Sequence, residues 1–167
     1  MRSERKKLIV YLASGLFNSA ERLRNAQLAF YLRKLGRKVI LPQKEALKFY
    51  RGGLFETKAM AIDCAEKAGK GSHICVALAD GAETDAGMGI EFGIAYRATE
   101  RAILVRTDFR THRETEVGLN AMFEQPGVSI IIAPCFDITT REISLFHKKL
   151  ARKIEKEICG IEKREGH

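Results

Sequence analysis

The sequence contains no tryptophan, and no apolar run approaches the roughly 20 residues that a membrane-spanning helix needs. The basic N-terminus is followed by an apolar stretch, residues 8–13, that has only the length of a strand, so we expect neither a signal peptide nor a membrane anchor. The four cysteines show no C-x-x-C spacing and the histidines are not paired, which argues against a disulfide framework and a zinc site. We therefore expect a cytoplasmic protein without a bound metal, with Cys75 and Cys135 as small core residues.

The charge of the chain is unevenly distributed. The formal net charge is +8, and residues 22–51 hold nine Lys and Arg residues against a single acid, Glu45. A nucleic-acid surface is one interpretation of this segment. A solvated helix face is the simpler interpretation, because no aromatic stacking platform and no nucleic-acid motif accompany the charge. Nucleic acid is therefore not the expected partner.

Length and periodicity indicate the fold class. With 167 residues, 46% of them hydrophobic, the chain can bury one core, and we expect a single domain over residues 1–167. Strands and helices alternate, which predicts an α/β, three-layer, five-stranded parallel sheet of the flavodoxin or Rossmann-like type, with helices on both faces. The predicted strands are residues 7–13, 39–41, 74–79, 102–106 and 128–133, and the predicted helices begin after Asn18, at Thr57, at Gly87 and at Thr139.

Local signals mark helix starts and irregular segments. Asn18 with Glu21, and Thr139 with Glu142, each have the spacing of a capping box. Residues 43–56 are less regular, and we interpret them as a loop over a ligand site. The longest irregular piece, residues 107–127, has the length of loops that are usually functional or mobile.

The most informative segment is residues 80–95, which joins a strand to a helix. A buried-looking strand runs into a loop with three acids and three glycines, and the helix that follows carries Glu91 between Ile90 and Phe92. Ligands of open α/β sheets bind beyond the carboxyl ends of the strands, and glycines let a ligand approach the backbone. A helix dipole would also favour the charged form of Glu91. This segment is the candidate active site.

Other polar side chains are expected in the same crevice. The first strand ends with Tyr11 and the turn of residues 13–17, and the third ends with the acids Asp80 to Asp85. Asp63 lies on the preceding helix, on a turn that faces inward. Converging carboxylates suit glycosyl transfer, in which one attacks or shields the anomeric carbon and another handles the proton of the leaving group. The alternatives are ordinary ones: helix caps, solvated acids and core aromatics.

Four pieces, in order along the chain, resemble the nucleoside 2-deoxyribosyltransferase family. They are the turn Tyr11-Leu-Ala-Ser-Gly-Leu-Phe17, the helix aspartate Asp63, the D-x-G-x-x-x-E-x-G signature in residues 85–93, and the N-x-M element Asn120-Ala-Met122. The resemblance covers most of the chain, although Ser14-Gly15 stands where members often have Gly-Pro or Gly-Ala. The family fold is a five-stranded parallel α/β sheet, and its members form dimers or hexamers, so a homo-oligomer is implied.

The resemblance implies catalytic roles for four residues. Glu91 would be the nucleophile that captures C1′ of the deoxyribose as the base leaves, and Tyr11 would orient its carboxylate. Asp63 and Asp85 would contact the nucleobase and pass a proton to its ring nitrogen. No cofactor is implied for this reaction of nucleotide salvage.

Five further residues would bind the substrates, which are nucleosides and free nucleobases. The resemblance implies that Phe17 stacks on the base and that Gly15 and Gly89 belong to the binding loops. Asn120 and Met122 would come from a neighbouring subunit and hold the 5′ end of the sugar. 

Two other functions stay open. A hydrolase of the same fold would cleave (deoxy)nucleosides or nucleoside 5′-monophosphates, and its phosphate would call for Ser and Arg donors such as Ser14, Arg106 or Arg110. Asn120-Ala-Met122 suits a free 5′-hydroxyl instead. A non-catalytic nucleotide- or nucleic-acid-binding module would use the basic residues 22–51.

Overall fold

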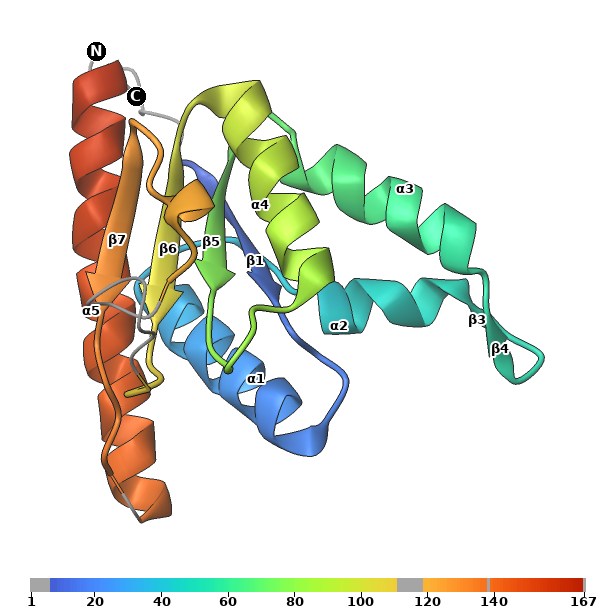
Figure 1. Cartoon of the computed structure of the whole chain (residues 1–167), viewed down its shortest axis with the longest axis horizontal. Helices are drawn as coiled ribbons and strands as arrows, with labels where there is room; N and C mark the ends of the chain where they lie inside the picture. The colour runs from blue at the N-terminus through green and yellow to red at the C-terminus, as the bar shows by residue number, and fades with distance from the viewer. Residues whose placement is uncertain (1–6, 111–118, 138, 167) are drawn as a thin grey trace.

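A computed structural model describes residues 7–110, 119–137 and 139–166 (Figure 1). Five strands form one sheet in the order β2-β1-β5-β6-β7, and every neighbouring pair is parallel. The predicted five-stranded parallel α/β sheet is confirmed. Its strands are β1 (Ile9–Ser14), β2 (Val39–Ile40), β5 (His73–Leu78), β6 (Ala102–Arg106) and β7 (Val128–Ile132).

Helices cover both faces of this sheet. Both predicted capping boxes are present, at Asn18 with Glu21 and at Thr139 with Glu142, and they satisfy N–H groups that a helix start leaves without intrahelical partners. The helices are α1 (Ser19–Lys34), α2 (Pro42–Glu45), α3 (Thr57–Ala68), α4 (Ala86–Thr99) and α5 (Thr140–Glu165), with two 3₁₀ turns, η1 (Ala46–Phe49) and η2 (Ala121–Phe123).

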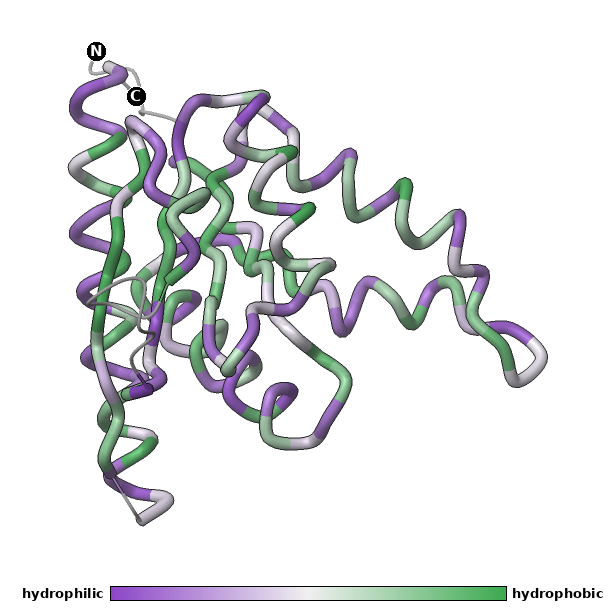
Figure 2. The backbone as a smooth tube through the Cα atoms, viewed as in Figure 1, coloured by the Kyte–Doolittle hydropathy of each residue, from purple (hydrophilic) through white to green (hydrophobic). Residues whose placement is uncertain are grey.

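The two faces of the sheet carry side chains of different size. One core cluster joins large aliphatic residues of β1 and β5, such as Val10 and Val76, to α1 and α5. The other cluster joins α4 to small residues of the same strands, including Ala13 and Ala77. Small side chains let a helix approach a sheet closely. Figure 2 shows the hydrophobic colour concentrated in the central strands and alternating with hydrophilic residues along α5.

Residues 43–56 do not form the expected loop. They continue α2 into η1 and then into a two-stranded hairpin of β3 (Tyr50–Arg51) and β4 (Leu54–Phe55), which projects away from the sheet (Figure 1). Gly52 and Gly53, at φ 58° and 88°, provide the positive φ that a tight hairpin turn requires. The middle of the other irregular stretch, residues 111–118, lies outside the described residues.

The cysteines occupy different environments, and all four are free. Cys75 in β5 is buried against α4, as predicted. Cys135 is only half-buried, and the prediction of a core position was wrong because β7 ends at Ile132, before this residue. Within the described ranges, no helix is both long and apolar enough to span a bilayer.

Residues 22–51 are less free to bind a polyanion than their sequence indicates. Arg37 is fully buried and forms ion pairs with Glu155 and Glu162 of α5. The Arg37 guanidinium holds the pKa of Glu162 below its usual range. Three more basic side chains of this segment are also ion-paired, which weakens the nucleic-acid interpretation; they are Arg24 with Asp80, Lys48 with Glu45, and Arg51 with Glu56.

Replacing Arg37 by methionine is expected to lower the free energy of unfolding by about 3 kcal/mol, because two largely buried carboxylates lose their shared partner. Urea denaturation followed by circular dichroism measures the loss. The matched control is Arg33→Met, since Arg33 is exposed and donates a hydrogen bond to the Val39 carbonyl. Equal losses in the two variants would contradict the assignment of Arg37 as a core ion-pair residue.

Candidate active site

Glu91 and Tyr11 meet across the small-residue face of the sheet. Tyr11 is buried on β1, and its hydroxyl donates a hydrogen bond to Glu91 Oε1 over 2.7 Å. Burial, and then the adjacent Glu91 charge, raise the pKa of Tyr11 well above its usual value. The phenol therefore stays protonated and acts as a hydrogen-bond donor. The sequence-predicted pairing of these two residues is present in the structure.

Glu91 has a raised pKa, mainly because its carboxylate is partly buried. The hydrogen bond from Tyr11 acts in the opposite direction, and the charge of Asp85 adds to the rise. We expected the helix dipole to favour the charged form of Glu91, but the pKa of this residue is raised. Glu91 is the sixth residue of α4, whereas the dipole effect falls off within the first turn.

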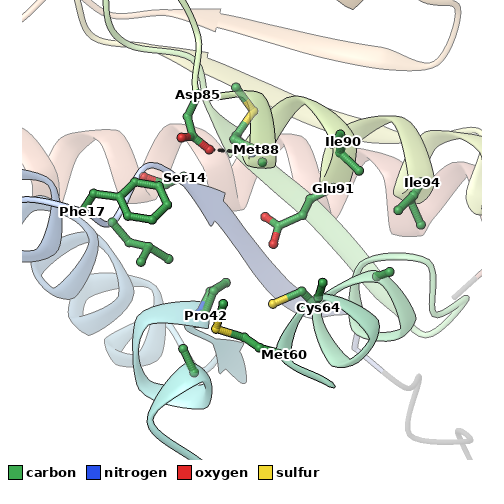
Figure 3. A pocket seen from close by; sticks show the side chains of 15 residues that line it. Ser14, Phe17, Pro42, Met60, Cys64, Asp85, Met88, Ile90, Glu91 and Ile94 are labelled. Atoms are coloured by element: carbon green, nitrogen blue, oxygen red, sulfur yellow. Dashed lines mark hydrogen bonds between the residues drawn. The ribbon is translucent and has the colours of Figure 1, made fainter. Parts of the chain in front are cut away.

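Asp85 occupies the N-terminus of that helix. It is the N-cap of α4, and its Oδ1 atom accepts the Met88 N–H over 2.8 Å. Its side chain also lines the same cavity as Glu91, close to Phe17 in Figure 3. The structure thus combines the two interpretations of Asp85, a helix cap and a member of the candidate site.

The cavity around Glu91 has a volume of about 250 Å³. It lies between α3 and α4, and α2 and the turn after β1 complete its walls (Figure 3). An apolar concave pocket with a few convergent polar groups is the usual form of a small-molecule site. The polar members are Ser14, Cys64, Asp85 and Glu91, and the apolar walls include Leu16, Phe17, Pro42, Ala46, Met60, Ala61, Ala65, Met88, Ile90 and Ile94.

Phe17 stands at the mouth of this cavity, with 81% of its surface exposed. Its backbone N–H donates to Glu21 Oε2 over 2.9 Å, so the first turn of α1 holds the loop that carries the ring. Gly15 makes room for this contact, because a Cβ there would lie 3.0 Å from the Glu21 carboxyl carbon. Gly15 therefore shapes the loop, although it is not among the residues that line this cavity.

Asp63 is held beside the cavity rather than in its lining. Its carboxylate accepts a hydrogen bond from Lys67 over 2.6 Å, and Lys67 also bonds Glu45 over 2.8 Å. Burial alone would lower the pKa of Lys67, but the hydrogen bonds to the two acids raise it. The next residue of α3, Cys64, does line the cavity, and the sequence analysis did not assign it to the site.

Asn120 and Met122 do not line the cavity of their own chain. Asn120 Oδ1 accepts the Met122 N–H over 2.9 Å, and the Met122 side chain is 73% exposed. Phe123 anchors η2 by packing edge-on against Phe92 of α4, with the ring centroids 5.0 Å apart. Gly89 is also outside the lining, and a Cβ there would meet no atom within 4 Å.

A second, polar cavity of about 410 Å³ adjoins the first and shares Asp85 with it. Arg24 pairs with Asp80 over 2.7 Å, and Arg110 pairs with Asp108. The Arg110 contact holds the pKa of Asp108 well below its usual range. Five acids therefore face two arginines that are already paired; the acids are Glu21, Asp80, Glu83, Asp85 and Asp108.

The other suggested phosphate donors are engaged elsewhere. Ser14 donates to Asn25 Oδ1 over 2.8 Å and accepts from Arg24 over 3.0 Å. Arg106 is fully buried and donates to the Ala79 carbonyl over 2.7 Å, beneath the loops that follow β5 and β6. In the part of the chain that the structure describes, no group of three or more His, Cys, Asp or Glu side chains is arranged to hold a metal ion.

Comparisons with known proteins bear on the family and the fold. The model of the family described as nucleoside 2-deoxyribosyltransferase matches residues 10–134. A search of curated proteins found no match.

Solved structures share the fold at low sequence identity. A conserved protein from Enterococcus faecalis V583 aligns with a TM-score of 0.62 and 23% identity, covering 90% of this chain and 99% of that one. A 2-deoxyribosyltransferase from Bacillus psychrosaccharolyticus aligns with a TM-score of 0.55 and 22% identity, covering 70% of this chain and 81% of that one. A CMP N-glycosidase from Clostridium botulinum aligns with a TM-score of 0.53 and 17% identity, covering 89% of this chain and 98% of that one.

These structural likenesses speak for the fold alone, so the family assignment depends on the sequence match. That match begins within β1, includes both acids of the residues 85–93 signature and the Asn120-Ala-Met122 element, and ends just after β7. The chain belongs to the nucleoside 2-deoxyribosyltransferase family.

Proposed function

We propose that this chain transfers 2-deoxyribose between nucleobases through a covalent deoxyribosyl intermediate on Glu91, with retention at C1′. The observation that carries the proposal is a partly buried carboxylate, held by the Tyr11 hydroxyl over 2.7 Å, that faces an apolar cavity. A nucleophile of this kind needs a fixed orientation and a site from which water is excluded. Family membership supplies the substrate class.

In the first half-reaction, a Glu91 carboxylate oxygen forms a bond to C1′ while the bond from C1′ to the base nitrogen breaks. A proton passes to the departing base, and Asp85 is the acid of the cavity placed to supply it; Asp63 would serve if it left Lys67. General acid catalysis of this kind contributes about 10²–10⁴-fold. A second base then attacks C1′ from the face that the first base left, the bond from C1′ to the Glu91 oxygen breaks, and the proton of the incoming base returns to the carboxylate that acted as the acid. Two inversions give net retention.

The missing 2′-hydroxyl helps this chemistry. A hydroxyl next to C1′ withdraws electrons and destabilises the oxocarbenium-like transition state, so a 2-deoxy sugar reaches that state more easily. The apolar walls formed by residues such as Met60 and Ile94 disfavour bound water near the intermediate. Transfer to a second base then competes favourably with hydrolysis.

Electrostatics favour a free nucleoside over a 5′-monophosphate. The N-terminus of α4 is a ready anion site, but the carboxylate of Asp85 already occupies it. The adjoining polar cavity has five acids, and its two arginines are paired with Asp80 and Asp108. A phosphate dianion placed there would be repelled, whereas sugar hydroxyls find acceptors.

Incubation with deoxyinosine and adenine is expected to give deoxyadenosine and hypoxanthine, measured by chromatography. A Glu91→Gln variant keeps the shape of the side chain but removes the nucleophile, and its rate should fall at least about 10³-fold. A 2-fluoro-deoxyribosyl substrate should leave a covalent adduct on the Glu91 peptide, detected by mass spectrometry.

Two outcomes of the same assay would overturn the assignment. Release of the base into water with no exchange product would identify a hydrolase. Faster cleavage of deoxyinosine 5′-monophosphate than of deoxyinosine would show that the acidic cavity does not select against phosphate.

The reaction should be sensitive to acid. Since burial raises the pKa of Glu91, the attacking carboxylate is lost as the pH falls, and this loss should begin above the pKa of an exposed glutamate, roughly 4.3. Tyr11→Phe removes a donor that favours the charged form, so the acidic limb of the kcat/KM profile should move to higher pH and the rate should fall roughly 10- to 100-fold. An unchanged limb in Tyr11→Phe would argue against this role of Tyr11.

Subunit mixing tests whether Asn120 serves a neighbouring site. We expect Asn120→Ala and Glu91→Gln to be inactive separately, because each lacks a necessary group. In mixed dimers, one of the two sites would combine an intact Glu91 with an intact Asn120, restoring about one quarter of the wild-type activity after random mixing. If Asn120 acts within its own chain, the mixture stays inactive.

A further inference from the structure

We propose that Asn25 of α1 is a positioning residue for the nucleobase, because it fixes the turn after β1 and the start of α2, which form two walls of the cavity. This inference rests on the proposed function, in which the leaving and the incoming base bind in the cavity around Glu91. Asn25 is not among the residues that line that cavity. It acts on the walls from outside, through hydrogen bonds.

The Asn25 side chain is buried, with 2% of its surface exposed, although asparagine is mostly an exposed residue. Its Nδ2 atom donates to the Gly15 carbonyl over 2.9 Å and to Gln43 Oε1 over 3.2 Å, and its Oδ1 atom accepts from the Ser14 hydroxyl over 2.8 Å. A backbone carbonyl can only accept, so the bond to Gly15 fixes which end of the amide is the nitrogen. One buried amide therefore connects α1 to the end of β1, to the turn after it and to α2.

The turn after β1 depends on this anchor. Packing does not hold the Phe17 ring, since 81% of its surface is exposed, so the backbone of the turn sets its position at the mouth of the cavity. Side chains of α1 hold that backbone at two points. Glu21 accepts the Phe17 N–H over 2.9 Å at the exposed end, and Asn25 donates to the Gly15 carbonyl at the buried end. Leu16, between these points, also lines the cavity.

The start of α2 depends on the same amide. This helix has only four residues, and a helix so short needs tertiary contacts to be stable. Gln43 supplies such contacts, because it accepts from Asn25 and its Nε2 atom donates to the Arg22 carbonyl over 3.0 Å. Pro42, the preceding residue, lines the cavity (Figure 3). Asn25 thus fixes the Pro42 wall and the Phe17 wall relative to each other.

Asn25→Leu keeps the approximate size of the side chain and removes its hydrogen bonds. We expect KM for adenine, at saturating deoxyinosine, to rise roughly 5- to 20-fold, because the walls that hold the base lose their common anchor. The Tyr11–Glu91 pair lies on β1 and α4 and keeps its own hydrogen bond, so kcat should stay within about 3-fold of the wild type. A merely structural role would instead lower kcat through a smaller folded fraction and leave KM unchanged.

The matched control is Arg37→Met, which also removes a buried polar side chain but lies at the start of β1, where Arg37 donates to the Leu8 carbonyl. Its KM for adenine should equal that of the wild type. Equal rises of KM in Arg37→Met and Asn25→Leu would overturn the inference, as would a wild-type KM in Asn25→Leu.

A second variant tests whether Asn25 and Gln43 act as one unit. Gln43→Met removes the partner on α2 and should also raise KM for adenine. Since the two residues share a hydrogen bond, KM of the double variant should be close to that of the more impaired single variant. Two rises that multiply would contradict a shared role. If Asn25→Leu does not fold, a wild-type KM in Gln43→Met overturns the inference by itself.

Binding of adenine alone, measured by titration calorimetry, does not depend on turnover. The Kd should rise in Asn25→Leu by about the same factor as KM and stay unchanged in Arg37→Met. An unchanged Kd in Asn25→Leu, or no binding by the wild type, would contradict the inference. If Asn25→Leu weakens binding but the wild type exchanges no base, the proposed function fails while the role of Asn25 stands.

Discussion

The candidate site depends on the close approach of α4 to a sheet face made of small side chains. Ala13 and Ala77 leave room on that face, while larger residues such as Val10 and Val76 fill the opposite one. The asymmetry lets a tyrosine in the middle of β1 reach a glutamate in the second turn of α4. A large residue in place of either alanine would push α4 outward and separate Glu91 from the Tyr11 hydroxyl.

A second interaction arranges the loops at the same edge of the sheet. Asp80, directly after β5, accepts the N–H groups of Thr107 and Asp108 over 2.5 and 3.0 Å, and it pairs with Arg24 of α1. One carboxylate thus connects the loops after two strands to a helix on the other face. The Asp80 carboxylate therefore has a structural role. The acids of residues 80–85 differ in role although they look alike in the sequence.

Much of the fold followed from local signals. The alternation of strands and helices and the two capping boxes are properties of short segments, and the structure confirms them. The meeting of Tyr11 and Glu91 was also accessible, because parallel strands bring their carboxyl ends to one edge and the family motif marks both residues.

What the sequence could not supply depends on contacts between distant segments. Asp63 is held by Lys67, whereas the next residue, Cys64, lines the cavity together with Glu91. Which of the two faces the cavity depends on the rotation of α3 about its axis, and a short sequence segment does not reveal that rotation. The raised pKa of Glu91 follows from burial, which outweighs the dipole that the helix position suggested. Likewise, the sequence indicates surface charge at Arg24 and Arg37, because their partners are distant in the chain. Arg24 pairs with an acid 56 positions away, and Arg37 pairs with acids at least 118 positions away.

The candidate site is built from two parts of the protein. One part is the sheet with α4, and the other is the extension formed by α2, η1, the β3–β4 hairpin and α3. Tyr11 and Glu91 belong to the sheet and α4, whereas much of the cavity wall belongs to α2 and α3. The ion pair of Lys67 with Glu45 joins α3 to α2. Under the proposed function, substitutions in that wall would change which base fits while leaving Glu91 and Tyr11 in place. The architecture therefore lends itself to diversification of substrate choice around an unchanged reaction.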